Sequence, residues 1–126
     1  MRKRVRIDAP RQGEIWTVRF DPTVGSEIHK TRPALVVSAD FVGRLPLRIV
    51  VPLTTLGGRR VHNALLIPIR AGRANGLVQD SYADVFQIKS VSTARFQQRL
   101  GFVSISELSE VMDGVALCLG WYDGRP

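Results

Sequence analysis

The densest group of chemically capable side chains lies in residues 21–37, where turn residues lead into an apolar run. The guanidinium of Arg32 presents a planar fork that fits phosphate oxygens, and it stays charged at any physiological pH. Glu27 offers a carboxylate that could accept a proton or fix the loop, and His29 could stack on a base or assist proton transfer. Arg32 precedes Pro33 at the start of an apolar strand, where functional loop residues are common. We expect Arg32 to be a functional residue; the alternatives are a surface salt bridge for Arg32 and an exposed spectator role for His29.

The charge of the chain is strongly basic and unevenly distributed. There are 18 lysines and arginines against 11 aspartates and glutamates, a formal net charge of +7. Between Phe41 and Gln79 there are six arginines and no carboxylate, whereas residues 101–126 carry one basic and four acidic side chains. A surface of this kind favours polyanions such as nucleic acid, or anionic membranes. The alternative is charge that serves solubility alone.

The other titratable residues argue against several kinds of site. The single cysteine, Cys118, excludes an internal disulfide framework and a cysteine-rich zinc site. It lies in an apolar run and is expected to be a small buried residue, not a nucleophile. Because the only histidines are His29 and His62, we expect no metal site and no cofactor.

The organisation of the chain predicts one cytoplasmic domain that makes no contact with a membrane. No apolar stretch approaches the roughly 20 residues that cross a bilayer. The start is basic like a signal peptide, but residues 8–11 replace the apolar core that should follow. We predict a flexible basic N-terminal tail over residues 1–10, one domain over residues 11–122 and a short tail over residues 123–126.

Short apolar runs separated by turn residues predict five or six strands. In the first run Trp16, Val18 and Phe20 alternate onto one face, where they are expected to be core residues. Pro52 and Pro68 mark edges or bulges, because proline cannot donate to a sheet ladder. The predicted strands are Glu14–Phe20, Ala34–Ser38, Arg48–Thr54, Asn63–Ile69 and Leu77–Gln87, the last as one strand or two short ones.

The last part of the chain changes to a helical period. Apolar residues recur at three- and four-residue steps from Ile105 to Leu119, which predicts one amphipathic helix. Ser104 and Glu107 have the spacing of a capping box at its start. Thr93–Arg99 is predicted to form a shorter helix. The fold class is therefore mainly β with appended helices (α+β), a small, strongly curved sheet or barrel.

Four segments together resemble the MazF/PemK family of toxin ribonucleases. Residues 21–37 contain the pattern D-P-x-x-G-S-E, then R-P and an apolar strand. Residues 50–54 are similar to the family's apolar strand that ends in a threonine, and residues 76–81 and 87–91 resemble its later strand pair. With the final helix, the resemblance covers roughly residues 11–121.

The resemblance implies a small SH3-like β-barrel of the CcdB/PemK type that forms homodimers. It also implies cleavage of single-stranded RNA without a metal, which leaves a 2′,3′-cyclic phosphate and a 5′-hydroxyl. The partner implied is a MazE-like antitoxin that inhibits through an acidic, flexible segment. A type II toxin of this kind would inhibit translation and growth as an mRNA interferase.

The same resemblance assigns roles to particular residues. Arg32 matches the family's catalytic arginine, Thr54 its catalytic threonine, and Glu27 is the nearest candidate base. The candidate RNA-binding residues are His29, Lys30, Thr55, Arg59, Arg60, Gln79 and Ser81. Phe86 stands where some members carry an acidic residue, so no catalytic role transfers to that position.

Two other functions remain open from the sequence. One is a non-catalytic, gyrase-binding toxin like CcdB on the same fold, and the other is a plain RNA-binding β-barrel module. The combination of Arg32, Pro33 and Thr54 favours a nuclease over both, because binding alone needs no such group of residues.

Overall fold

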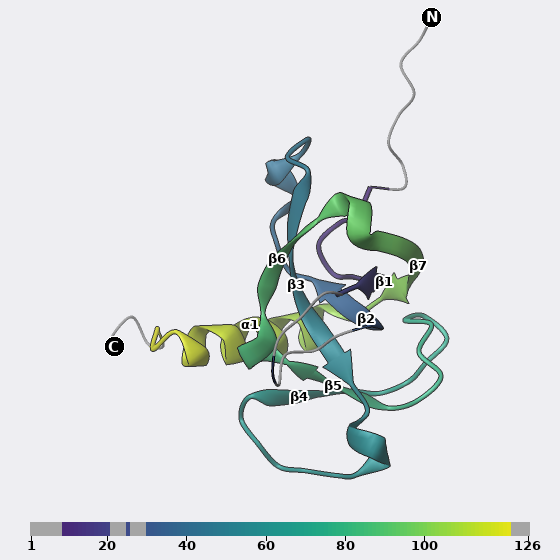
Figure 1. The fold of residues 1–126 in the computed structure, drawn as a ribbon. Helices are drawn as coiled ribbons and strands as arrows, with labels where there is room; N and C mark the ends of the chain where they lie inside the picture. The colour runs from purple at the N-terminus through teal and green to yellow at the C-terminus, as the bar shows by residue number, and fades with distance from the viewer. Residues whose placement is uncertain (1–8, 21–24, 26–29, 122–126) are drawn as a thin grey trace, which may run out of the picture.

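The described part of the computed structural model comprises residues 9–20, 25 and 30–121, and it forms one sheet and one α-helix (Figure 1). The strands are β1 (Glu14–Arg19), β2 (Thr31–Val36), β3 (Leu47–Thr54), β4 (Leu66–Ile69), β5 (Ser81–Asp84), β6 (Lys89–Ser92) and β7 (Phe96–Phe102). The helix α1 (Ile105–Cys118) follows them. Single 3-10 turns η1 (Asp40–Val42), η2 (Leu56–Gly58), η3 (Val85–Gln87) and η4 (Thr93–Arg95) lie between strands.

The sheet is antiparallel, with β3 as its most connected strand. Its order is β4-β5-β3-β2-β1-β7, and β6 pairs with the first half of β3. In the described residues the path ends at β4 and β7, so the curved sheet does not close into a complete barrel. The mainly β fold with a C-terminal helix is confirmed.

The central strands are buried on both faces, because alternate residues enter two separate apolar clusters. Ile15, Leu35 and Val51 belong to the cluster that also contains Val111 of α1. Their neighbours Trp16 and Ala34, with others on the same strands, belong to the second cluster. Figure 1 shows α1 crossing one side of the sheet, so the second cluster lies on the face away from the helix.

The C-terminal helix forms as its sequence predicts. Ser104 Oγ accepts the Glu107 backbone N–H at 3.0 Å, and the Glu107 carboxylate accepts the Ser104 backbone N–H at 3.0 Å. Gly114 is buried where α1 meets the sheet, and a Cβ there would lie 3.3 Å from both Ile67 Cδ1 and Val85 Cγ1. The glycine therefore allows the close approach of α1, which offsets its cost of about 1 kcal/mol in a helix.

Three strand predictions need correction. Pro52 is fully buried in β3 and does not lie on an edge strand. On one side of β3, β6 pairs with it as far as Val50 and β5 pairs with it from Leu53 onward. Pro52 lies between these two pairings, so neither β6 nor β5 requires a backbone N–H from it. Residues 93–99 form the turn η4 and then β7, because the ring of Phe96 packs edge-on against Trp16 and β7 pairs with β1. The sheet has seven strands instead of five or six.

The other strand predictions are confirmed in type, with shifted ends. β4 is an edge strand with an exposed Pro68, as predicted, but it begins only at Leu66. β2 begins earlier than expected, at Thr31, so Arg32 and Pro33 lie within the strand. Residues 77–87 yield the short strand β5 and the turn η3.

Arg48 is buried, in contrast to the surface role that composition suggests for arginines in residues 41–79. Its guanidinium donates to four backbone carbonyls, at 2.9 Å to Pro10, 2.8 Å to Leu45, 2.8 Å to Leu47 and 3.1 Å to Gly43. These bonds fasten the start of the domain to the loop before β3. In the described residues, no helix is long and apolar enough to cross a membrane.

Candidate functional site

Arg32 lies near the start of β2 and Thr54 at the end of β3, and these two strands are neighbours in the sheet. β2 and β3 pair in register from Val36–Val50 to Ala34–Pro52, and two residues further along each strand are Arg32 and Thr54. Side chains alternate along a strand, so both extend the sheet face that α1 does not cover. Arg32 is exposed and Thr54 is half-buried, so the cation and the hydroxyl are both accessible at this end of the strand pair.

The hydroxyl of Thr54 is held in place by the loop that follows it. Thr54 Oγ1 accepts the backbone N–H of Leu56 at 3.3 Å. A hydroxyl that accepts in this way still has its own hydrogen to donate. Thr54 can therefore donate to an anionic oxygen without losing this contact.

The loop after Thr54 has an unusual backbone conformation. Leu56 has a positive φ of 53°, and Gly57 and Gly58 follow with φ values of 65° and 85°. Glycine adopts this left-handed region freely, whereas a leucine there is strained. The Gly58 N–H bonds the Thr55 carbonyl at 2.8 Å, and the resulting turn carries Arg59 to the surface.

The predicted residues of the preceding loop are only partly described. Lys30 is exposed with a positive φ of 67°, and its carbonyl accepts the Phe20 N–H at 2.9 Å. Glu27 and His29 lie outside the described residues. The structure therefore gives no position for the candidate base.

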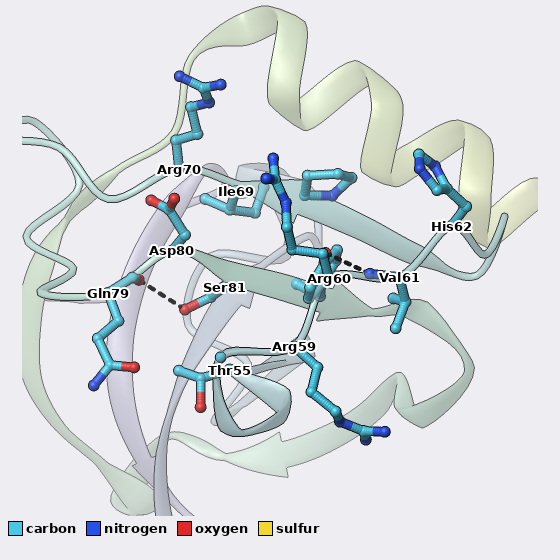
Figure 2. Close-up of a pocket in the computed structure, with 13 residues that line it drawn as sticks. Thr55, Arg59, Arg60, Val61, His62, Ile69, Arg70, Gln79, Asp80 and Ser81 are labelled. Atoms are coloured by element: carbon cyan, nitrogen blue, oxygen red, sulfur yellow. Dashed lines mark hydrogen bonds between the residues drawn. The ribbon is translucent and has the colours of Figure 1, made fainter.

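A cavity of about 620 Å³ opens beside the end of β3 (Figure 2). Its walls come from the loop after β3, from β4 and its following residue, and from the start of β5. Of the predicted RNA-binding residues, five line it: Thr55, Arg59, Arg60, Gln79 and Ser81. Arg32, Thr54 and Lys30 are not in the lining, although Thr54 directly precedes Thr55.

Two hydrogen bonds organise this cavity. Tyr82 Oη accepts the backbone N–H of Val61 at 3.0 Å. This bond fixes residues 59–61, which we call the arginine loop, to β5. Ser81 Oγ donates to the Gln79 carbonyl at 3.1 Å, and Ser81 is buried. Tyr82 is also the register partner of Thr54, so the same residue links the cavity to the Arg32–Thr54 position.

Sequence reasoning missed four polar residues of the cavity: His62, Arg70, Asp80 and Tyr82. His62 and Arg70 belong to the carboxylate-free stretch, which was a usable signal. Asp80 directly follows that stretch in the sequence, and in the structure it lines the same cavity as the arginines. No sequence signal marks Tyr82, because its position depends on the pairing of β4 with β5.

Cys118 of α1 and Asp84 of β5 have raised pKa values, but neither side chain lines the cavity. Burial raises the pKa of the Cys118 thiol, and the charge of Asp84 raises it further, so this cysteine stays protonated. It packs against the apolar core but is half-buried, not fully buried as predicted. Burial also raises the pKa of Asp84, against the opposing effect of backbone hydrogen bonds at Phe86 and Gln87. In the described part of the chain, no group of three or more histidine, cysteine, aspartate or glutamate side chains could hold a metal ion.

Residues 11–119 match the family described as PemK-like, MazF-like toxin of type II toxin-antitoxin system. The chain is 35% identical over 115 residues to endoribonuclease MazF9 of Mycobacterium tuberculosis, covering 86% of this chain and 95% of that protein. It is 32% identical over 111 residues to endoribonuclease PemK of Escherichia coli, covering 86% and 80%.

Solved structures show the same fold at lower identity. The crystal structure of MazF from Deinococcus radiodurans superposes with a TM-score of 0.74 at 24% identity, covering 89% of this chain and 97% of that one. An endoribonuclease in complex with its cognate antitoxin, from a mycobacterial species, superposes with a TM-score of 0.69 at 18% identity, covering 90% and 98%.

Proposed function

Because this chain belongs to the PemK-like, MazF-like toxins of type II toxin–antitoxin systems, we propose that it is an endoribonuclease that cuts single-stranded RNA and so inhibits translation and growth. The relatives at 35% and 32% identity are both named endoribonucleases. The observation that supports the proposal within this chain is the β2–β3 pairing, which brings the strand ends that carry Arg32 and Thr54 to the same end of the sheet, next to a cavity lined by arginines.

The reaction we propose uses the substrate's own 2′-hydroxyl as nucleophile. Its oxygen forms a bond to phosphorus while the bond from phosphorus to O5′ breaks, which leaves a 2′,3′-cyclic phosphate and a 5′-hydroxyl. A general base accepts the 2′ proton and a general acid donates a proton to the departing O5′. Cationic donors stabilise the charged phosphorane oxygens. No metal ion is required, because the arginine provides the positive charge.

The side chains divide these tasks by their chemistry. Arg32 holds the phosphorane oxygens with its permanent charge and planar fork. Thr54 donates its hydroxyl to one of these oxygens while Leu56 N–H keeps it oriented. Glu27 is the candidate base, and Lys30, His29 and the cavity residues bind flanking nucleotides.

The test is digestion of a long RNA by the purified protein with and without excess chelator. We expect equal rates, and we expect the new ends to be 2′,3′-cyclic phosphates and 5′-hydroxyls when mapped chemically. Loss of activity in chelator with recovery in Mg²⁺ would overturn the metal-free mechanism. Intact RNA under all conditions would favour a gyrase-binding toxin or an RNA-binding module instead.

We further propose that a MazE-like antitoxin inhibits this protein through an acidic, flexible segment. Two fold neighbours were solved as complexes, an endoribonuclease with its cognate antitoxin and MazE–MazF of Deinococcus radiodurans. In this chain the three arginines of the cavity offer a complementary surface for carboxylates.

A homodimer acting in the cytoplasm is the assembly we propose. Phe41 is 90% exposed and Ile105 87% exposed, so large apolar side chains remain uncovered on one protomer. A two-fold interface would cover such surface and the open edges of the sheet. Sedimentation equilibrium at micromolar concentration should give twice the 14.0 kDa of the chain, and a monomer mass would exclude the dimer.

A further inference from the structure

The cavity beside Thr54 contains one carboxylate among its cations. Arg59, Arg60 and Arg70 all line it, and Asp80 is the one acidic side chain in the described lining. In the described residues Asp80 forms no ion pair with any of these arginines. The carboxylate of Asp80 and the guanidinium groups of the three arginines are therefore not paired with one another, so a ligand can bind both.

Asp80 is anchored so that part of its carboxylate remains available. Its Oδ1 accepts the backbone N–H of Ala71 at 2.8 Å, across the loop that joins β4 to β5. This bond orients the carboxylate at the cavity wall, and Figure 2 shows Asp80 between Arg70 and Gln79. The Oδ2 atom keeps its lone pairs for a ligand, and an oxygen with one N–H bond can accept a second.

A carboxylate repels the phosphates of RNA, so its partner in this cavity must be another part of the nucleotide. The base edges supply hydrogen-bond donors that a carboxylate accepts. Guanine alone presents two adjacent donors, N1–H and N2–H, which match the two oxygens of a carboxylate. It also presents O6 and N7, the acceptors that an arginine fork binds in its commonest specific contact.

We propose that this cavity is a guanine-binding subsite for a nucleotide next to the cleaved phosphate, with Asp80 as its specificity-determining residue. This inference rests on the proposed ribonuclease function. Asp80 accepts N1–H and N2–H of the base, and an arginine of the cavity donates to O6 or N7. The cavity begins at Thr55, the residue after Thr54, so the base it takes belongs to a nucleotide adjoining the phosphate at Thr54.

The first experiment measures base preference without assuming a cleavage motif. A random-sequence RNA pool is cut under single-hit conditions by the wild type and by Asp80→Asn, and the ends are sequenced. The amide keeps an oxygen for Ala71 N–H but cannot accept from both guanine donors. We expect guanine to be favoured at one position next to the cut in the wild type, and Asp80→Asn to lower that preference about tenfold.

Two controls separate this inference from the proposed function. Asp113→Asn removes an exposed carboxylate on α1, outside the cavity, and should leave the preference unchanged. Replacing the favoured guanosine by inosine, which lacks the N2 amino group, should slow cleavage by the wild type but not by Asp80→Asn. Cleavage with no guanine preference, or a preference unaltered by Asp80→Asn, overturns the guanine subsite and leaves the ribonuclease standing. No cleavage of any RNA overturns both.

Discussion

In the proposed reaction, Arg32 is the residue assigned to supply positive charge at the phosphate. Replacing it by alanine should lower the single-turnover cleavage rate by roughly 10²–10³, the usual cost of one transition-state donor in a preorganised site. The fold should persist, because Arg32 is exposed near the start of β2. Arg44→Ala is the matched control, since it removes an exposed arginine from a different loop. An unchanged rate in Arg32→Ala would remove this residue from the site.

Thr54 allows the hydroxyl to be tested separately from the shape of the side chain. Thr54→Val keeps the β-branched form but loses both the donor and the acceptor for Leu56 N–H, so we expect the cleavage rate to fall about tenfold or more. Thr54→Ser keeps the hydroxyl and should restore most of the rate. If valine and serine behave alike in single-turnover measurements, the hydroxyl has no role in cleavage.

At the scale of elements, Arg48 joins the start of the domain to the loop before β3. Arg48→Met should lower the free energy of unfolding by about 2 kcal/mol, because four backbone carbonyls lose a charged donor. Arg48→Lys should recover only part of this, since an ammonium cannot reach acceptors on both sides as a planar fork does. Denaturant unfolding measures both, with Arg44→Met expected to change stability by less than about 0.5 kcal/mol.

The elements that the sequence predicts best are those with local causes. The helix α1 is specified by its own apolar period and by Ser104 and Glu107, which are three residues apart. β7 is different: its pairing with β1 joins Glu14 to Phe102, and no local signal in residues 93–99 contains that information. Arg48 is a similar case, because composition treats an arginine as surface charge and cannot show the carbonyls gathered around it.

For the candidate site, the sequence nominates residues but cannot place all of them relative to one another. Family resemblance identifies Arg32 and Thr54 from their sequence context, although they are 22 positions apart. Asp80 and Tyr82 lie beside the arginine loop because β4 pairs with β5 in one particular register. In this register Pro68 pairs with Tyr82, and Ile69 pairs with Ser81. This register is a property of the folded sheet, so the sequence alone could not place them.

For the molecule as a whole, a shared surface predicts competition between RNA and antitoxin. Both polyanions should use the arginine-lined cavity, so saturating antitoxin should lower the RNA affinity of the inactive Arg32→Ala protein at least tenfold. Rising salt should weaken RNA binding with a log–log slope of about −0.7 for each phosphate contacted. A ternary titration measures this, and unchanged RNA affinity would mean that the antitoxin inhibits from a separate surface.

The pairing of β1 with β7 joins two parts of the chain that are synthesised far apart in time. Val18 of β1 is the register partner of Arg32, and β1 in turn gains its second neighbour only when β7 is made. Glu14 and its partner Phe102 are 88 residues apart, which at the usual rate of translation is a delay on the order of 4–18 s. A growing chain therefore carries Arg32 and Thr54 for seconds before the sheet that supports them is complete.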